Sequence, residues 1–243
     1  MQWLEDHLAK AKKNGINIYI VGHIPPNKKS GKPAYSKHCY RDYLDLLGDY
    51  GDIIYGHFHG HTNVDNLSLL VKADQQKHGK KKKKHPSKYQ LITLPKGSIP
   101  KIKPSYELVA VLSNSPSIVP VHNPSLRVYD FSPAQGGAIL GYTQFYADLH
   151  KANRDSKLEF TVEYTPKDTY GMKDLSIASW KEFIPRLLDP STKLYDLYSK
   201  FFTVSAITTK EEDKQDDEDD QDDTDVEEEL EADSSWVSGA LHI

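Results

Sequence analysis

The sequence has little cysteine and no long hydrophobic run. Cys39 is the single cysteine among 243 residues, which excludes an intrachain disulfide framework and a cysteine-rich zinc site. No apolar stretch approaches the roughly 20 residues that a membrane-spanning helix needs. No secretory signal peptide opens the chain. These absences predict a chain without a transmembrane segment and without a disulfide scaffold.

Charge is distributed unevenly along the chain. Residues 211–233 contain 16 acidic residues and one lysine, which leaves 30 basic and 19 acidic residues elsewhere. The rest of the chain therefore has a net charge of +11, although the whole chain has −4. A basic body suits a polyanionic partner such as nucleic acid, a phosphate polymer or anionic lipid. The acidic segment has almost no apolar residues to bury, so we expect a disordered tail over residues 210–243.

The first part of the chain alternates helical and strand-like patterns. Apolar residues recur at helical spacing in residues 1–15 and 37–51, and short β-branched runs lie at 16–21 and 52–55. This order predicts an α/β layer. Further strand-like runs follow at 66–71, 89–94, 106–113, 126–131, 138–149 and 158–165, and helical spacing returns at 176–188 and 191–205. A lysine-rich insert without apolar periodicity, residues 72–88, separates two of the predicted strands.

Histidines follow the first two predicted strands. "IYIVGH" ends at His23, and "IIYGHFHGHTN" places His57, His59 and His61 at alternate positions. Because parallel strands end at the same edge of a sheet, their terminal histidines can converge there. Glycine before a histidine permits a sharp turn, and neutral imidazole is a common ligand of Zn, Mn and Fe. The pattern predicts a metal site at this edge.

The two Gly-His blocks resemble the last motif blocks of the calcineurin-like metallophosphoesterases. The segments "VGHIPP", "FHGHTNVD" and "PSIVPVHNPSLRVYDF" are similar to the branch that contains acid sphingomyelinases and fungal endopolyphosphatases. "CYRDYLDLLGDYGDIIYGHFHGHTN" looks most like the vacuolar endopolyphosphatases. The resemblance implies the C-terminal part of a metallophosphoesterase α/β sandwich. It assigns residues 1–150 to that domain, 151–209 to a mostly helical subdomain and 210–243 to the acidic tail.

In this family two divalent metal ions (Mn, Mg, Zn or Fe) clamp a phosphate while a metal-bound hydroxide attacks it. The first three ligand blocks of the family, Asp-x-His, Gly-Asp and Gly-Asn-His, are absent from this sequence. The resemblance therefore implies that the N-terminal part of the same domain is missing. We expect the chain alone to be inactive, since it lacks the carboxylate that bridges the two metals.

Two registers are possible for the second histidine block. The flanking "TNVD" resembles the family's "THVD", which places His23 and His61 on one metal and Asn63 on the other. An amide oxygen at Asn63 suits Mg or Mn better than Zn. His57 and His59 would then support the site as outer residues. In the alternative "GHFH" register, His57 and His59 are themselves the ligands.

The resemblance implies a vacuolar endopolyphosphatase, a hydrolase of phosphoanhydride bonds in inorganic polyphosphate, and no nucleic-acid partner. One alternative is an acid sphingomyelinase-like phosphodiesterase, although that branch usually carries many disulfides. Another is a non-catalytic polyanion-binding protein or pseudoenzyme. "NLS", which begins at Asn66, fits the pattern for N-glycosylation. Arg127 in "NPSLRVY" is expected to be an ion-pair partner rather than a phosphate clamp.

Overall fold

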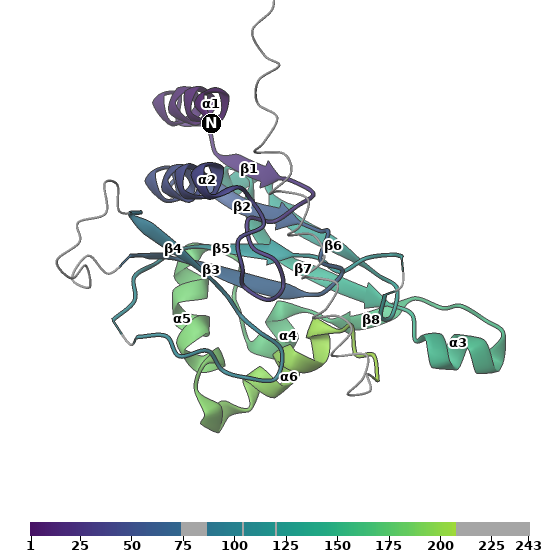
Figure 1. Cartoon of the computed structure of the whole chain (residues 1–243). Coiled ribbons are helices and arrows are strands. Elements are labelled where there is room, and N and C mark those ends of the chain that lie inside the picture. The colour runs from purple at the N-terminus through teal and green to yellow at the C-terminus, as the bar shows by residue number, and fades with distance from the viewer. Residues whose placement is uncertain (74–86, 104, 120, 208–243) are drawn as a thin grey trace, which may run out of the picture. The chain divides into compact units, whose positions relative to one another are not determined.

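A five-stranded mixed sheet forms the centre of the fold. The computed structural model describes residues 1–73, 87–103, 105–119 and 121–207 (Figure 1). The strand order is β1-β2-β5-β3-β4, in which β2 pairs in parallel with both β1 and β5, and β3 pairs antiparallel with β5 and β4. The strands are β1 (Ile18–Val21), β2 (Ile54–His59), β3 (Asn66–Lys72), β4 (Tyr89–Thr93) and β5 (Leu108–Asn114). The predicted α/β class is confirmed.

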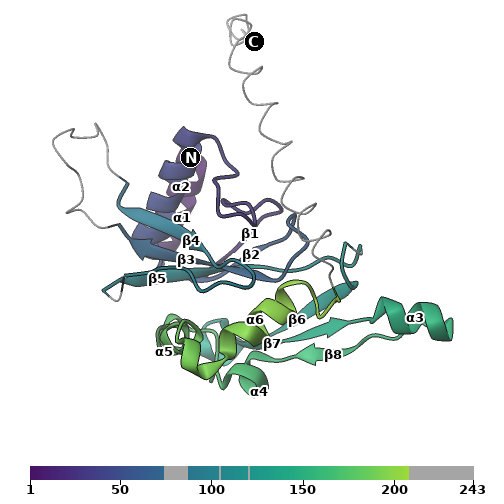
Figure 2. The same ribbon diagram turned by 60° about the horizontal axis from the view of Figure 1, so that its bottom comes forward.

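Two amphipathic helices cover one face of this sheet (Figures 1 and 2). They are α1 (Gln2–Lys13) and α2 (Lys37–Asp49). Leu8 and Leu47 are fully buried and share an apolar cluster with Ile54, Leu70 and Leu112 of the sheet. The 3.6-residue period of each helix places its apolar stripe on the sheet. Trp3, in contrast, is 71% exposed, so it does not belong to the stripe.

The opposite face is covered by C-terminal helices and by a second sheet, as Figure 2 shows. The helices are α5 (Ile177–Leu187) and α6 (Leu194–Phe202), and the strands β6 (Ser125–Ser132), β7 (Ala138–Tyr146) and β8 (Thr161–Tyr164) pair antiparallel in that order. Phe183, Ile184 and Phe201 share a second apolar cluster with Leu69 and Tyr164. Residues Met1–Ala206 form one compact unit.

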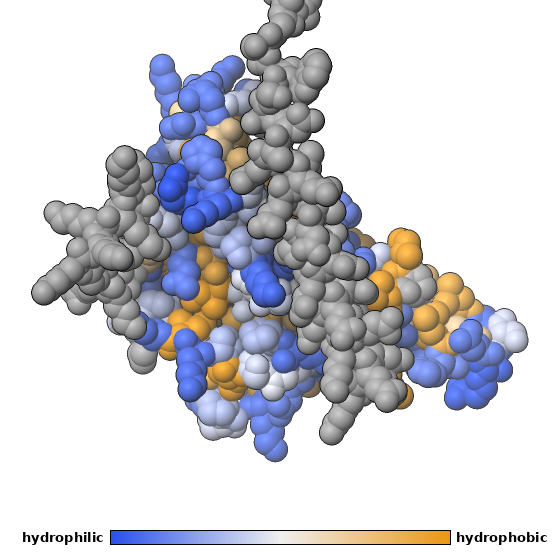
Figure 3. Space-filling model, viewed as in Figure 1, coloured by the Kyte–Doolittle hydropathy of each residue, from blue (hydrophilic) through white to orange (hydrophobic). Residues whose placement is uncertain are grey.

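Two short helices are not predicted by the sequence patterns. α3 (Leu149–Asp155) begins where a strand was expected to end, and the side chain of Asp148 caps it by accepting from the Lys151 amide. α4 (Pro166–Tyr170) is capped by Thr165 and ends at Gly171 in the left-handed conformation. Figure 3 shows hydrophobic residues around α3, where Leu158 and Phe160 are exposed. Short 3₁₀ turns occupy Pro133–Gln135 and Pro190–Thr192.

Several expectations lie outside the described residues or are corrected by them. The predicted acidic tail, residues 210–243, and residues 74–86 of the lysine-rich insert are outside the described ranges. Asn66, the residue that fits the glycosylation pattern, is only 4% exposed at the start of β3, so the folded protein does not present this side chain for modification. Among the helices that the structure describes, none combines the length and apolar character required to cross a membrane.

Candidate functional site at the ends of β1 and β2

The candidate site lies where β1 and β2 end side by side. The two strands are parallel, with Val21 opposite Phe58, so the segments that follow them leave the sheet at the same edge. The Gly22 amide donates to the Phe58 carbonyl at 3.0 Å. The Gly60 amide donates to the His23 carbonyl, also at 3.0 Å. These bonds hold the two post-strand loops together.

His23 and His61 face each other across these loops. Their ring centroids are 5.2 Å apart and the rings are nearly perpendicular, at 78°. His61 and Asn63 both have left-handed backbones, with φ of 69° and 58°. This conformation is uncommon outside glycine, and strained residues of this kind cluster at functional sites. His23 and His61 are both solvent-exposed, so a ligand has access to them.

His57 and His59 lie inside β2 instead of in the loop. Their exposed fractions are 3% and 5%. Burial lowers the pKa of His57 to about 3, helped by repulsion from His59, and burial lowers the pKa of His59 to about 4. Both rings are therefore neutral at neutral pH. The His59 ring lies against the Gly22 main chain, 3.5 Å from the place where a Cβ would stand.

Asn114, the last residue of β5, holds the loop that carries His61 and Asn63 by two hydrogen bonds. Its side-chain amide donates to the Thr62 hydroxyl at 2.6 Å and to the Val64 carbonyl at 2.8 Å. Thr62 and Val64 flank Asn63 in the chain. A single buried side chain therefore sets the path of the loop around Asn63.

A buried ion pair fixes the far end of the same loop. Arg127 Nη2 lies 2.5 Å from Asp65 Oδ2, and both side chains are at most 5% exposed. Arg127 also donates to Gln144 at 2.7 Å and to Ser113 at 3.1 Å. Its guanidinium stacks over the Tyr142 ring at 4.0 Å. The predicted role of Arg127 as an ion-pair partner is confirmed.

The described residues supply only part of a metal site. They contain no group of three or more histidine, cysteine, aspartate or glutamate side chains that could hold a metal ion. His23 and His61 are brought together, with ring centroids 5.2 Å apart, and Asn63 lies on the same loop as His61. His57 and His59 are buried residues of β2, within the sheet. This donor set does not complete the two-metal site that the resemblance implies.

Comparison with known proteins finds sequence similarity to phosphodiesterases. Residues 105–214 match the family described as "Acid sphingomyelin phosphodiesterase C-terminal region". The chain is 29% identical to sphingomyelin phosphodiesterase A of Dictyostelium discoideum over 84% of its own length and 30% of that protein. It is 25% identical to sphingomyelin phosphodiesterase 1 of Caenorhabditis elegans over 83% of its own length and 31% of that protein. It is 27% identical to the cyclic GMP-AMP phosphodiesterase SMPDL3A of Bos taurus over 84% of its own length and 41% of that protein.

The chain thus spans between 30% and 41% of these relatives. The names of the relatives favour the phosphodiesterase alternative over the endopolyphosphatase prediction. The matches extend over more than four fifths of the chain. Over this length the chain is similar in sequence to sphingomyelin and cyclic GMP-AMP phosphodiesterases.

Proposed function

We propose that this chain provides one side of the active site of a metal-dependent phosphodiesterase. The observation that carries the proposal is the pair His23 and His61, which follow the ends of two parallel strands. Their rings face each other with centroids 5.2 Å apart. Their neighbour Asn63 offers an oxygen on the same loop. Homology to sphingomyelin and cyclic GMP-AMP phosphodiesterases supports phosphodiester hydrolysis as the reaction class.

In this proposal His23 and His61 hold one divalent cation, and Asn63 contributes to a second position. A divalent cation at such a site neutralises phosphate charge and lowers the pKa of bound water. The chain's own contribution is to hold the imidazoles in place: Asn114 and Asp65 fix the loop, and the buried neutral His59 packs beneath Gly22. The remaining ligands would come from sequence that corresponds to the unmatched part of the relatives.

The test is a chimaera in which this chain replaces the matching segment of Dictyostelium sphingomyelin phosphodiesterase A. Hydrolysis of bis(p-nitrophenyl) phosphate, sphingomyelin and cyclic GMP-AMP is measured with added Zn or Mn. We expect a chimaera that hydrolyses at least one of these diesters, and no turnover by the chain alone. A folded chimaera without activity on any of the three diesters would contradict the proposal.

Inorganic polyphosphate remains a second candidate substrate, with the vacuole as its compartment. The supporting observation is the net charge of +11 outside residues 211–233, which suits a polyanion. The same chimaera distinguishes the two candidates when phosphate release from long-chain polyphosphate is measured beside diester hydrolysis. Release from polyphosphate without diester hydrolysis would favour the endopolyphosphatase.

A further inference from the structure

Lysines gather on the loops at the edge of the central sheet that carries the candidate site. β1, β2, β5 and β4 all run in the same direction, because β3 pairs antiparallel with both β4 and β5. The segments after β1 and β4, residues 22–36 and 94–103, therefore leave the sheet at the edge where β2 ends. Neither segment contains an aspartate or glutamate, and each contains three lysines: Lys28, Lys29, Lys32, Lys96, Lys101 and Lys103.

The loop between β2 and β3 adds no exposed negative charge to this edge. Asp65 is its one acidic residue within residues 60–65. It is buried, and its carboxylate is paired with Arg127 at 2.5 Å. The three segments together therefore present lysine ammonium groups and histidines without an exposed carboxylate. A surface with charge of one sign raises the local concentration of ligands of the opposite sign.

Backbone hydrogen bonds shape the loop that follows His23, residues 24–34, which we call the lysine loop. The Lys28 amide donates to the Lys32 carbonyl at 2.8 Å, and the Gly31 amide donates to the Lys28 carbonyl at 2.9 Å. Gly31 has a φ of 83°, a left-handed conformation that glycine adopts at little cost and that closes the turn. The loop therefore carries its three lysines on one compact turn.

Asn27 ties the lysine loop to the end of β4. Its side chain is 2% exposed and donates to the Thr93 hydroxyl at 3.0 Å, while its amide oxygen accepts from the Tyr40 hydroxyl at 2.7 Å. Lys28 follows Asn27 directly, and Lys96 follows Thr93 by three residues, which span at most about 11 Å. The two lysine-bearing segments are therefore neighbours at this edge.

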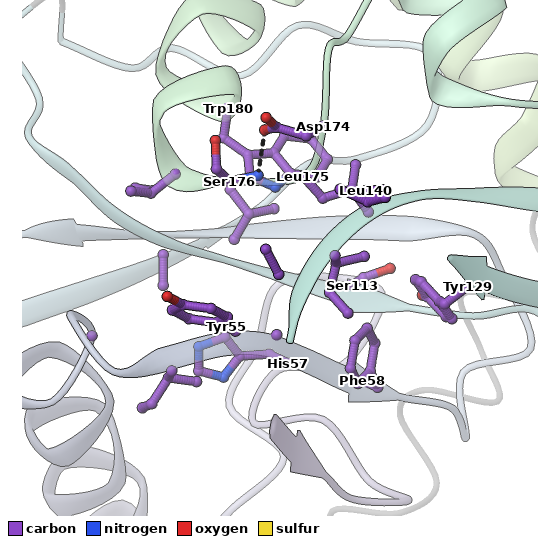
Figure 4. Close-up of a pocket in the computed structure, with 18 of the residues that line it drawn as sticks. Tyr55, His57, Phe58, Ser113, Tyr129, Leu140, Asp174, Leu175, Ser176 and Trp180 are labelled. Atoms are coloured by element: carbon purple, nitrogen blue, oxygen red, sulfur yellow. Dashed lines mark hydrogen bonds between the residues drawn. The ribbon is translucent and has the colours of Figure 1, made fainter. Parts of the chain in front are cut away.

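The lysine loop also begins at a proposed metal ligand. Lys28 follows His23 by five residues, a span of at most about 18 Å. The Gly60 amide, from the loop of His61, donates to the His23 carbonyl at 3.0 Å and holds the start of the loop in place. The His57 ring instead lines a cavity beside β7 and α5 (Figure 4). An anion on the lysine loop thus lies within a few residues of the pair His23 and His61, and away from His57.

We propose that the lysine loop and the segment of Lys96 bind a linear chain of condensed phosphate and direct it toward His23 and His61. Lysine ammonium groups bind phosphate as point charges. Residues 25–34 and 94–103, all of which the structure describes, have no aromatic side chain and no exposed large apolar one. They therefore lack the stacking groups that bind single-stranded nucleic acid and the apolar groups that insert into membranes. The direction toward the two histidines rests on the proposed function.

The experiment measures the binding of fluorescently labelled long-chain polyphosphate to the full 243-residue chain by anisotropy. EDTA is present throughout, so a metal site cannot contribute, and the result is distinguishable from failure of the proposed function. The variant Lys28→Gln/Lys29→Gln/Lys32→Gln removes three charges from the lysine loop. We expect its affinity at about 50 mM salt to fall at least about tenfold, and the slope of log affinity against log salt to become shallower by about two.

The matched control is Lys10→Gln/Lys12→Gln/Lys13→Gln. It removes the same charge from the last turn of α1, which precedes β1 and so lies toward the opposite edge of the sheet. We expect its affinity to change by less than about threefold, because exposed charges beyond the screening length contribute little. Circular dichroism melting checks that both variants fold.

Four outcomes would overturn the inference. The first two are an absence of polyphosphate binding and equal losses in the two triple variants, which would reduce the effect to net charge. The third is equally strong competition by a single-stranded oligonucleotide of the same total charge. The fourth is binding to phosphatidylserine vesicles that the lysine-loop variant loses while it keeps polyphosphate binding, which would identify a lipid headgroup as the ligand.

Discussion

Arg127 and Asp65 are joined by a buried ion pair that ties the loop of the candidate site to the second sheet. Removing one partner leaves an uncompensated buried charge, which typically costs about 3–5 kcal/mol. We predict a loss of this size in the free energy of unfolding for Arg127→Met, measured by urea denaturation. The double variant Arg127→Met/Asp65→Asn should recover part of the loss, since no charge is then left buried.

Arg154→Met is the control for this prediction. Arg154 pairs with Asp155 at 2.8 Å, but its side chain is 71% exposed, and exposed pairs contribute about 0–1 kcal/mol. Equal losses for Arg127→Met and Arg154→Met would contradict the role given to the buried pair.

The lowered pKa values of His57 and His59 predict that the folded chain loses stability in acid. Their pKa values, about 3 and about 4 in the folded chain, lie below the ordinary histidine value of 6.5. Their contribution to stability is complete above pH 6.5 and is lost as the pH falls toward 3–4, because the unfolded chain binds the protons first. The free energy of unfolding should fall by up to about 1.4 kcal/mol per pH unit for each histidine.

The check is urea denaturation at pH 7 and at pH 5. The free energy of unfolding should decrease less between these two pH values in His57→Leu than in the unchanged chain. His150→Leu, at an exposed position of α3, should show the same decrease as the unchanged chain. The explanation fails if His57→Leu also keeps the full decrease.

At the residue scale, the sequence predicts which site residues lie close together better than it predicts the side chains that hold them in place. His23 and His61 meet because each follows a Gly at the end of a parallel strand, and that geometry can be inferred from two similar segments. The support from Asn114 and Asp65 is not predictable in the same way. It depends on the packing of β5 and β6 against a loop far away in the chain, and no local pattern encodes that packing.

At the scale of elements, α5 illustrates how a helix end is fixed. Ser176 is its N-cap, and the Ser176 hydroxyl accepts from the Ser179 amide. Ser176→Ala should lower the free energy of unfolding by about 1 kcal/mol. Ser36→Ala is the matched control, since Ser36 precedes α2 without a side-chain cap bond. Thermal or urea unfolding measures both, and equal effects would contradict the capping argument.

Long periodic segments are predictable, and short capped ones are missed. α2, α5 and β5 coincide with their apolar patterns because each buries one face in the core. α3 buries none of its residues, so it leaves no apolar period to detect. α4 has only five residues, and its signals were the cap Thr165 and the terminal Gly171.

At the scale of the whole molecule, charge separation predicts self-competition for polyanions. The segment 211–233 carries 16 acidic residues against a body of net charge +11. Deleting it should tighten polyphosphate binding by roughly tenfold at low salt and steepen the salt dependence. Fluorescence anisotropy with labelled polyphosphate at 50 and 200 mM salt, about the range over which such contacts weaken strongly, measures both effects.

A charge-neutral tail separates charge from length in this experiment. Replacing the acidic residues of 211–233 by Asn and Gln keeps the chain length and should have the same effect as the deletion. If neither change alters the affinity at low salt, the tail does not compete with the polyanion.

The central claim is that His23 and His61 hold one cation, and metal affinity of the chimaera tests it most directly. Isothermal titration with Mn or Zn is performed on the chimaera and on its His23→Ala, His61→Ala, His59→Ala and His150→Ala variants. We predict a loss of more than about 100-fold for His23→Ala and His61→Ala, and of about 10- to 100-fold for His59→Ala, as is typical of residues that support a ligand. His150→Ala should have no effect. Unchanged affinity in His61→Ala, together with complete loss in His59→Ala, would contradict the claim and establish the alternative "GHFH" register.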